Sequence, residues 1–227
     1  MNTSVKEAAS DAPAKAGLVE WLAPSRTAVV VIDIQVDFAL PEGVLGQAGL
    51  DMSVVAPAVA KATELVALAR AAGTPVVFVG LQTSAALDSP AWRERMVRRG
   101  GNPDEESAVC RVGERGSEFV GPTPLPGELV IPKIRYSSFF GTTLHAGLTA
   151  LGVDTLLVCG LTTECCIDCT VRDAYHLDYQ VFIARDACGA YEVEIHEAAL
   201  KNLELNCATL VDTAEVAKAW SEHAAHG

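Results

Sequence analysis

The sequence has no excess of basic residues. Its 227 residues include 17 Lys and Arg against 29 Asp and Glu, which gives a formal net charge of −12. A nucleic-acid partner would need a basic surface to neutralise phosphates, so this balance argues against one. The acidic excess indicates little else, because acidic surfaces mostly serve solubility.

The sequence also lacks clear membrane and export signals. No apolar run approaches the length of a membrane span, and the alanine-rich start carries mixed charges without the apolar core of a signal peptide. We therefore expect no membrane partner, and we interpret residues 1–23 as a flexible N-terminal arm. No repeat or linker divides the rest, and half of all residues are hydrophobic, so residues 24–227 are predicted to form one domain.

The seven cysteines do not form a disulfide framework, because their number is odd and their spacing is irregular. Cys165, Cys166 and Cys169 crowd one segment, whereas the remaining cysteines are scattered. This usage is typical of a reducing compartment, so we expect the protein in the cytoplasm.

Short apolar runs alternate with segments of helical periodicity along the chain. The expected strands are Ala28–Ile34, Thr74–Leu81, Glu128–Pro132, Asp154–Cys159, Tyr179–Ala184 and Ala208–Val211. The expected helices are Val54–Ala72, Ala91–Arg99, Thr142–Leu151, Thr162–Leu177, Val193–Leu205 and Ala214–His223. Strands that are apolar throughout are buried on both faces, which is typical of parallel sheets. The pattern predicts an α/β fold of three layers, α/β/α, with about six mostly parallel strands. The polar stretch 82–127 between two strands is long enough to be functional.

Three chemically different side chains follow predicted strands. Asp33 ends the first strand, Lys133 ends the third and Cys166 lies just beyond the fourth. Ligands of open parallel sheets bind beyond the carboxyl ends of the strands, where the strand order reverses. We therefore expect a carboxylate, an amine and a thiol to meet at one site.

Cys166 is the candidate nucleophile. Gly160 permits a turn before the predicted helix, and a thiol in the first helical turn faces unpaired N–H groups that favour the thiolate. Neighbouring helical residues point about 100° apart, so only one of Cys165 and Cys166 can face the cleft. Spacing from Gly160 and Thr163 favours Cys166, and Cys165 is expected to pack as a small apolar residue.

A sulfur nucleophile also requires a group that accepts its proton and groups that stabilise the oxyanion. The five histidines fall in predicted helices or the tail, so Asp33 is the better proton acceptor, with Lys133 keeping the pair ionised. Backbone N–H groups from about Thr162 to Cys166 would form an oxyanion hole, and each would lower the activation barrier by about 3 kcal/mol. Attack on an amide would give a thioester and release ammonia.

Several residues admit more than one interpretation. Cys166 and Cys169 spell C-x-x-C, a redox or zinc pattern, but no thioredoxin-like lead-in or second ligand pair accompanies it. Gln35 either orients Asp33 or hydrogen-bonds a loop. The aromatic candidates for an apolar pocket wall, which are otherwise core fillers, are Phe38, Tyr136 and Phe140. The long segment contains Arg93, Arg98 and Arg99. These arginines either bind a carboxylate of the substrate or form a solvated helix face.

Three segments, Val30–Phe38, Ile131–Phe140 and Gly160–Ala174, together resemble the isochorismatase-like cysteine hydrolase superfamily. The resemblance implies a Rossmann-like fold and a catalytic triad of Asp33, Lys133 and Cys166. It also implies a cis peptide bond between Leu161 and Thr162 that aims the Thr162 N–H at the oxyanion, no cofactor, and a homo-oligomer, dimer or tetramer.

Departures from individual subfamilies narrow the expected activity. The nucleophilic cysteine argues against the vinyl-ether chemistry of isochorismatases, and residues 79–90 lack the histidine of the nicotinamidase metal cluster, so we expect no metal. The segment around Arg135 and Tyr136 looks most like ureidoacrylate, biuret and N-carbamoyl amidohydrolases, although Gln82–Ser84 departs from the ureidoacrylate enzymes. The prediction is hydrolysis of a linear amide or ureido C–N bond in a small polar substrate. The alternatives are a carboxamide hydrolase of the maleamate or nicotinamide type and a non-catalytic member that binds a small ligand.

Overall fold

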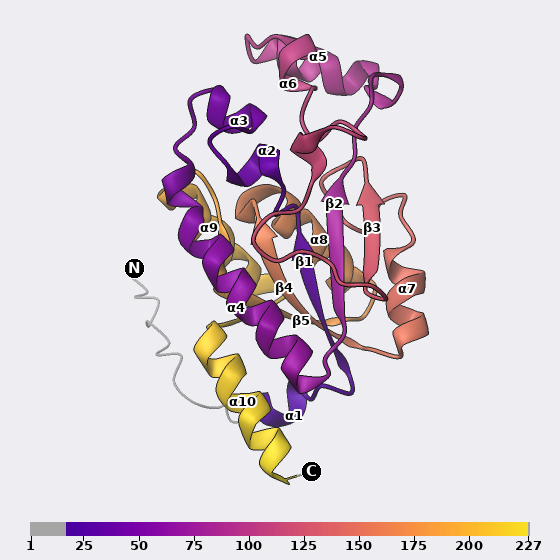
Figure 1. Cartoon of the computed structure of the whole chain (residues 1–227), viewed down its shortest axis with the longest axis vertical. Helices are drawn as coiled ribbons and strands as arrows, with labels where there is room; N and C mark the ends of the chain where they lie inside the picture. Colours follow the sequence, from indigo (N-terminus) through magenta and orange to yellow (C-terminus); the bar gives the residue numbers. More distant parts are fainter. Residues whose placement is uncertain (1–16, 227) are drawn as a thin grey trace, which may run out of the picture.

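A computed structural model describes residues 17–226, and six strands form one parallel sheet (Figure 1). The strands are β1 (Thr27–Ile32), β2 (Val76–Leu81), β3 (Leu129–Lys133), β4 (Thr155–Leu161), β5 (Gln180–Gly189) and β6 (Thr209–Val211). Their order is β3-β2-β1-β4-β5-β6, and every neighbouring pair is parallel. The order reverses between β1 and β4, which is where such sheets bind ligands. The predicted α/β fold is confirmed.

Helices cover both faces of the sheet (Figure 1). The long helices are α4 (Ala56–Ala72), α7 (Leu144–Leu151), α8 (Asp168–His176), α9 (Val193–Asn206) and α10 (Thr213–His226). Helices α4 and α10 pack together on one face, whereas α7, α8 and α9 lie on the other, as right-handed crossovers between parallel strands require. Every residue of β1, β2 and β4 is buried, because both layers shield these strands.

The core helix α4 corrects one expectation. The segment Met52–Ala72 is long and apolar enough to cross a membrane by length and composition, so the statement that no apolar run approaches that length is wrong for it. In the fold, this helix contacts β5 and buries one side against the sheet through Ala58, Ala62, Leu65, Val66 and Ala69. Helices that cover a sheet satisfy the same criteria, and the buried side makes α4 part of the core.

The N-terminal region is more ordered than predicted. Residues 1–16 of the expected arm lie outside the described residues, but Leu18–Trp21 form helix α1, which packs on α10. Leu22 is completely buried, and its carbonyl oxygen accepts a hydrogen bond from Trp220 Nε1 at 2.7 Å. The interpretation of residues 17–23 as a flexible arm is therefore wrong, because their apolar side chains join the core.

The long segment between β2 and β3 folds beyond the carboxyl ends of the strands, where it carries α5 (Pro90–Arg98) and α6 (Pro103–Glu106) (Figure 1). Buried Asp37 fastens it, because its carboxylate accepts the Cys110 N–H at 2.6 Å. An ion pair between Arg111 and Asp88 at 2.7 Å closes the segment on itself. The Asp37 carboxylate also accepts the Val44 N–H in α3 (Val44–Gln47), which follows the short helix α2 (Val36–Ala39).

Gly160 lies within β4, not in a turn as predicted, and its backbone leaves no room for a side chain beside β1. Its φ is +130°, and a Cβ atom there would lie 2.0 Å from the Ile32 carbonyl oxygen of β1. Strand β4 therefore continues to Leu161, and the following helix opens with a π-helical turn, Thr163–Ile167, before α8 begins. Only glycine satisfies both the dihedral angle and the contact.

We predict that Gly160→Ala lowers the free energy of unfolding by at least about 4 kcal/mol, because backbone atoms must move apart. Gly73→Ala is the matched control, since Gly73 also has positive φ, at +73°, but no atom lies within 4 Å of the added Cβ. That change should cost only about 1 kcal/mol. Urea-induced unfolding of both variants measures the difference, and equal losses would contradict the steric explanation.

Candidate active site

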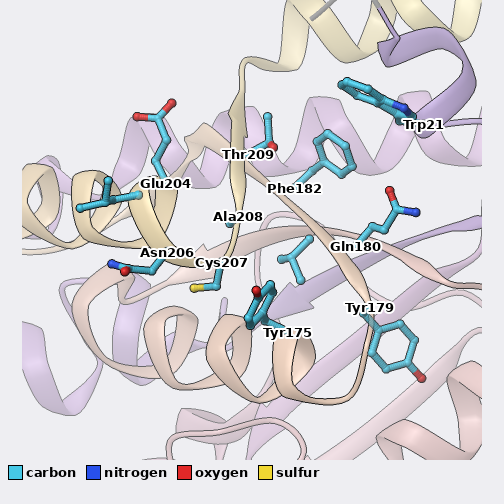
Figure 2. Close-up of a pocket in the computed structure, with 12 residues that line it drawn as sticks. Trp21, Tyr175, Tyr179, Gln180, Phe182, Glu204, Asn206, Cys207, Ala208 and Thr209 are labelled. Carbon is cyan, nitrogen blue, oxygen red and sulfur yellow. The ribbon is translucent and has the colours of Figure 1, made fainter. Parts of the chain in front are cut away.

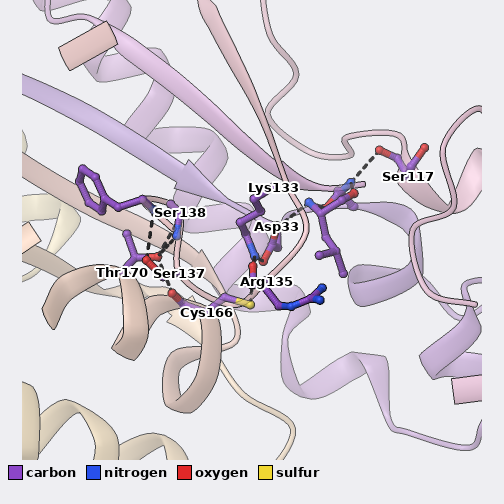
Figure 3. Close-up of polar contacts among 11 residues, drawn as sticks. Asp33, Ser117, Lys133, Arg135, Ser137, Ser138, Cys166 and Thr170 are labelled. Atoms are coloured by element: carbon purple, nitrogen blue, oxygen red, sulfur yellow. Dashed lines mark hydrogen bonds and ion pairs between the residues drawn. The ribbon is translucent and has the colours of Figure 1, made fainter. Parts of the chain in front are cut away.

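The three predicted side chains converge around the Lys133 amine (Figure 3). Lys133 Nζ lies 2.7 Å from Asp33 Oδ2 and 3.3 Å from Cys166 Sγ. Strands β1 and β4 are neighbours, so Asp33 and Cys166 follow adjacent strand ends, and the long lysine side chain reaches them from β3. The sequence therefore placed these three residues correctly at one site.

Asp33 is held rigidly at the end of β1. Its backbone has positive φ, +51°, and its N–H donates to the Val79 carbonyl oxygen at 2.9 Å. Oxygen Oδ1 accepts the Leu81 N–H at 2.9 Å, while Oδ2 pairs with Lys133. The side chain is almost fully buried, so its charge depends on these partners.

Lys133 uses all three of its N–H donors within the site. Besides Asp33 and Cys166, Nζ donates to the Arg135 carbonyl oxygen at 3.0 Å. Burial lowers the pKa of Lys133, but Asp33 and the Cys166 sulfur outweigh it and hold the pKa above its ordinary value. The amine is thus a permanent cation between an acid and a thiol.

The Cys166 thiol is only 6% exposed. A hydrogen bond with Cys165 and burial raise the pKa of Cys166 well above its ordinary value, with Asp33 adding to the rise and Lys133 opposing it. Burial therefore disfavours the thiolate form of Cys166, and the Lys133 amine is the group that opposes this effect. Attack on a substrate requires a base, and the Asp33–Lys133 pair is the nearest acid–base group.

A hydrogen-bond network fastens the segment after β3 to the cysteine helix (Figure 3). Thr170 Oγ1 donates to the Cys166 carbonyl oxygen at 2.6 Å and accepts the Ser138 N–H at 2.9 Å. Ser137 Oγ donates to Asp173 on α8. This network sets the position of Lys133 relative to Cys166. Sequence reasoning quoted these residues only as part of a motif, because their side-chain partners are more than thirty positions away.

Gln35 serves both roles considered for it, because it bonds the long segment at Ser117 and shares the Leu81 N–H with Asp33. Its Oε1 accepts the Leu81 N–H at 2.8 Å, the same N–H that binds Asp33. Its Nε2 donates to the carbonyl oxygens of Leu81 at 3.0 Å and Ser117 at 2.8 Å. These bonds fix the side chain against the backbone, and the substrate contact of Gln35 stays a prediction.

The predicted pocket-wall aromatics divide into three cases. Phe140 is 65% exposed, and its place in an apolar pocket wall stays a prediction. Phe38 is half-buried and packs against the core, with its role towards substrate still a prediction. Tyr136 is half-buried beside Trp92 of α5, with ring centroids 5.6 Å apart. Trp92 was missed because the contact joins two loops distant in sequence.

The turn that carries the nucleophile begins at a cis peptide bond between Leu161 and Thr162. Thr162 Oγ1 donates to Glu164 at 3.0 Å, and the role of the Thr162 N–H as an oxyanion donor stays a prediction. The hydroxyl oxygen of buried Thr163 lies 2.8 Å from His196 Nδ1 on α9. Burial lowers the pKa of His196, against the opposing effect of Glu197 and Glu164. His196 therefore supports the turn as a neutral ring.

A hollow lies at the end of the sheet opposite the triad (Figure 2). This groove of about 450 Å³ is lined by Trp21, Phe182, Tyr175 and Cys207, among others, at the amino ends of β5 and β6.

Within residues 17–226, no group of three or more His, Cys, Asp or Glu side chains is arranged to hold a metal ion. The expectation of a site without metal or cofactor stays a prediction.

Comparison with known proteins adds to the geometry. Residues 27–215 match the Isochorismatase domain. The chain is 35% identical over 195 residues to the ureidoacrylate amidohydrolase RutB of Methylobacterium radiotolerans, covering 81% of this chain and 75% of the relative. A cysteine hydrolase of Pseudomonas syringae has a similar structure, with a TM-score of 0.77, 25% identity and coverage of 88% and 94%. An N-carbamoylsarcosine amidase of Thermoplasma acidophilum matches with a TM-score of 0.67, 26% identity and coverage of 83% and 96%.

We expect Lys133→Met to lower the free energy of unfolding by about 3–5 kcal/mol, because it leaves Asp33 buried without its cation. The double variant Asp33→Asn, Lys133→Met removes both charges and should recover much of this loss. Urea unfolding of the two variants and the parent makes the comparison. An equally unstable double variant would show that the pair contributes by packing and not by charge.

The lowered pKa of His196 predicts a pH-dependent stability. The unfolded chain takes up this proton near the ordinary pKa of 6.5, whereas the folded chain takes it up only at lower pH. The contribution of His196 to the free energy of unfolding should therefore be complete above about pH 7. It should be lost as the pH drops towards about 5. His196→Gln should flatten this slope in urea titrations at several pH values. A slope that is unchanged by the substitution would contradict the prediction.

Proposed function

This chain belongs to the isochorismatase family, and we propose that it hydrolyses a linear amide or ureido C–N bond of a small polar molecule with release of ammonia. The observation that carries this proposal is the position of Lys133 Nζ, within 3.3 Å of both the Asp33 carboxylate and the Cys166 sulfur. The names of the similar ureidoacrylate amidohydrolase and N-carbamoylsarcosine amidase support the same class of bond.

The first half of the reaction forms a bond to sulfur. Cys166 Sγ attacks the carbonyl carbon, and its proton passes to Asp33 through the hydrogen-bonded group around Lys133. Negative charge then develops on the carbonyl oxygen, where backbone N–H groups of the turn from Thr162 to Cys166 stabilise it. The C–N bond breaks as the leaving nitrogen takes the proton from Asp33, which yields ammonia and a thioester.

The second half regenerates the thiol. A water molecule loses a proton to Asp33 and attacks the thioester carbonyl, and the C–S bond breaks. The sulfur recovers the proton and the acid product leaves, so the sum is amide plus water giving acid plus ammonia. Lys133 stays protonated throughout, because Asp33 and the Cys166 sulfur hold its pKa above the ordinary value.

A carboxamide hydrolase of the maleamate or nicotinamide type would use the same residues. The mass of the acyl group trapped on Cys166 separates the two, because a ureido substrate leaves a nitrogen on the acyl carbon. A non-catalytic member that only binds a small ligand would release no ammonia from any amide. The expected homo-oligomer and the cytoplasmic location stay predictions.

We predict that Cys166→Ala lowers the rate of ammonia release by at least about 10³-fold, since no other group supplies the bond to carbon. Cys169→Ser is the control and should keep activity within about 10-fold, because Lys133 donates to the Cys166 sulfur and Cys169 lies further along the chain, within α8. Ammonia assays and mass spectrometry of the acid-quenched enzyme provide the readouts. A Cys169→Ser variant as inactive as Cys166→Ala would favour redox chemistry at the C-x-x-C pair instead.

A further inference from the structure

The segment that leaves β5 contacts both sides of the candidate site. Residues 191–196, here called the clamp, connect the end of β5 to the first turn of α9. Strands β4 and β5 end side by side, because Leu161 pairs with Gly189. The clamp therefore starts next to the cis peptide bond that precedes the nucleophile turn, Thr163–Ile167.

The chain leaves the two central strands towards opposite faces of the sheet. After β1 it forms α2 and continues to α4 on one face, whereas after β4 it forms the nucleophile turn and continues to α8 on the other. Such a divergence marks the switch point of a parallel sheet. Helix α2, which follows Asp33, and the turn, which carries Cys166, therefore belong to opposite sides of the switch point.

Tyr191 holds the side of the switch point that carries α2. Its hydroxyl donates to the Phe38 carbonyl oxygen at 2.7 Å. Helix α2 has only one turn, so its last carbonyl groups lack donors within the helix. Burial raises the pKa of Tyr191, and Glu164 adds to the rise, so the hydroxyl keeps the proton that it donates. Tyr191 thus fixes α2 from a segment that is distant in the sequence.

His196 holds the other side, at the turn that carries the nucleophile. Its Nδ1 lies 2.8 Å from the hydroxyl oxygen of Thr163, which is completely buried. Thr163 and Cys166 share one π-helical turn, and helix α9 packs against this turn. The position of Thr163 therefore helps to set where the Cys166 sulfur meets the Lys133 amine.

We propose that the clamp sets the position of α2 relative to the nucleophile turn, with Tyr191 and His196 as positioning residues. Both contacts come from one short segment, so the two sides cannot move apart without breaking one of two hydrogen bonds. Release of α2 moves Phe38 and weakens substrate binding, whereas release of the turn misplaces the sulfur and slows its attack. The inference rests on the proposed function for the reaction that the clamp serves.

Tyr191→Phe tests the contact with α2, because it removes the hydroxyl and keeps the ring. In assays of ammonia release from ureidoacrylate, we expect KM to rise about 10-fold while kcat stays within about threefold. Tyr179→Phe is the matched control, since this hydroxyl also forms a hydrogen bond, at 2.9 Å to His145 Nδ1, but lies at the amino end of β5. The control should keep KM and kcat within about twofold. A change in Tyr191→Phe no larger than that of the control would overturn the proposal.

His196→Leu tests the contact with the nucleophile turn. We expect kcat to fall at least about 10-fold, because a misplaced nucleophile reacts slowly. His196→Asn, which places an amide near the position of Nδ1, should restore kcat to within about threefold of the parent. A purely structural role would destabilise both variants without this difference in kcat, so equal kcat values for the two would contradict the clamp. If His196→Leu does not fold, Thr163→Val removes the same hydrogen bond and takes its place.

A second readout does not depend on hydrolysis. Alkylation of Cys166 by iodoacetamide, followed by mass spectrometry of its peptide, reports how well the Lys133 amine favours the thiolate. His196→Leu should lower this rate about fivefold, and His196→Asn should restore it. A parent protein that releases no ammonia from any amide would refute the proposed function, and the alkylation rates then decide on the clamp. An alkylation rate that His196→Leu leaves unchanged would refute the clamp, whatever the parent hydrolyses.

Discussion

The buried ion pair between Asp33 and Lys133 is the interaction on which the rest of the site depends. Both side chains are at most 1% exposed, and neither charge can be kept in the interior without the other. The pair also holds the Lys133 amine where it reaches the Cys166 sulfur. The Asp33–Lys133 ion pair thus constrains the fold, and together with the Cys166 thiol it can also carry out acid–base chemistry.

Backbone groups at the carboxyl end of the sheet hold the buried pair and the nucleophile in position. The Leu81 N–H is shared by Asp33 and Gln35, and Gln35 in turn binds Ser117 in the long segment. On the other side, Thr170 bonds both the Cys166 carbonyl and the Ser138 N–H. Two networks therefore position the acid and the sulfur independently, and Lys133 connects them.

Charge is distributed unevenly in this acidic protein. Most arginines are neutralised by nearby carboxylates, such as Arg26 by Asp154 and Arg185 by Asp212. Arg135 forms no ion pair with a carboxylate within residues 17–226, and its Cζ lies 5.8 Å from the centroid of the Trp92 ring.

The sequence by itself determined the sheet, because apolar β-branched runs such as residues 28–32 have no other low-energy place in a globular chain. It also indicated Asp33, Lys133 and Cys166, since the ends of parallel strands must meet at one edge. It misplaced Gly160 and left out helix α1.

Only the tertiary structure decided which partner each polar or aromatic side chain found. Three contacts join segments that are far apart in the chain. They are the contact of Arg135 with the Trp92 ring, the hydrogen bond between Thr163 and His196, and the hydrogen bond from the Leu81 N–H to Gln35. Such contacts leave no periodic pattern in a sequence, because their energy depends on burial and geometry that exist only once the layers have packed.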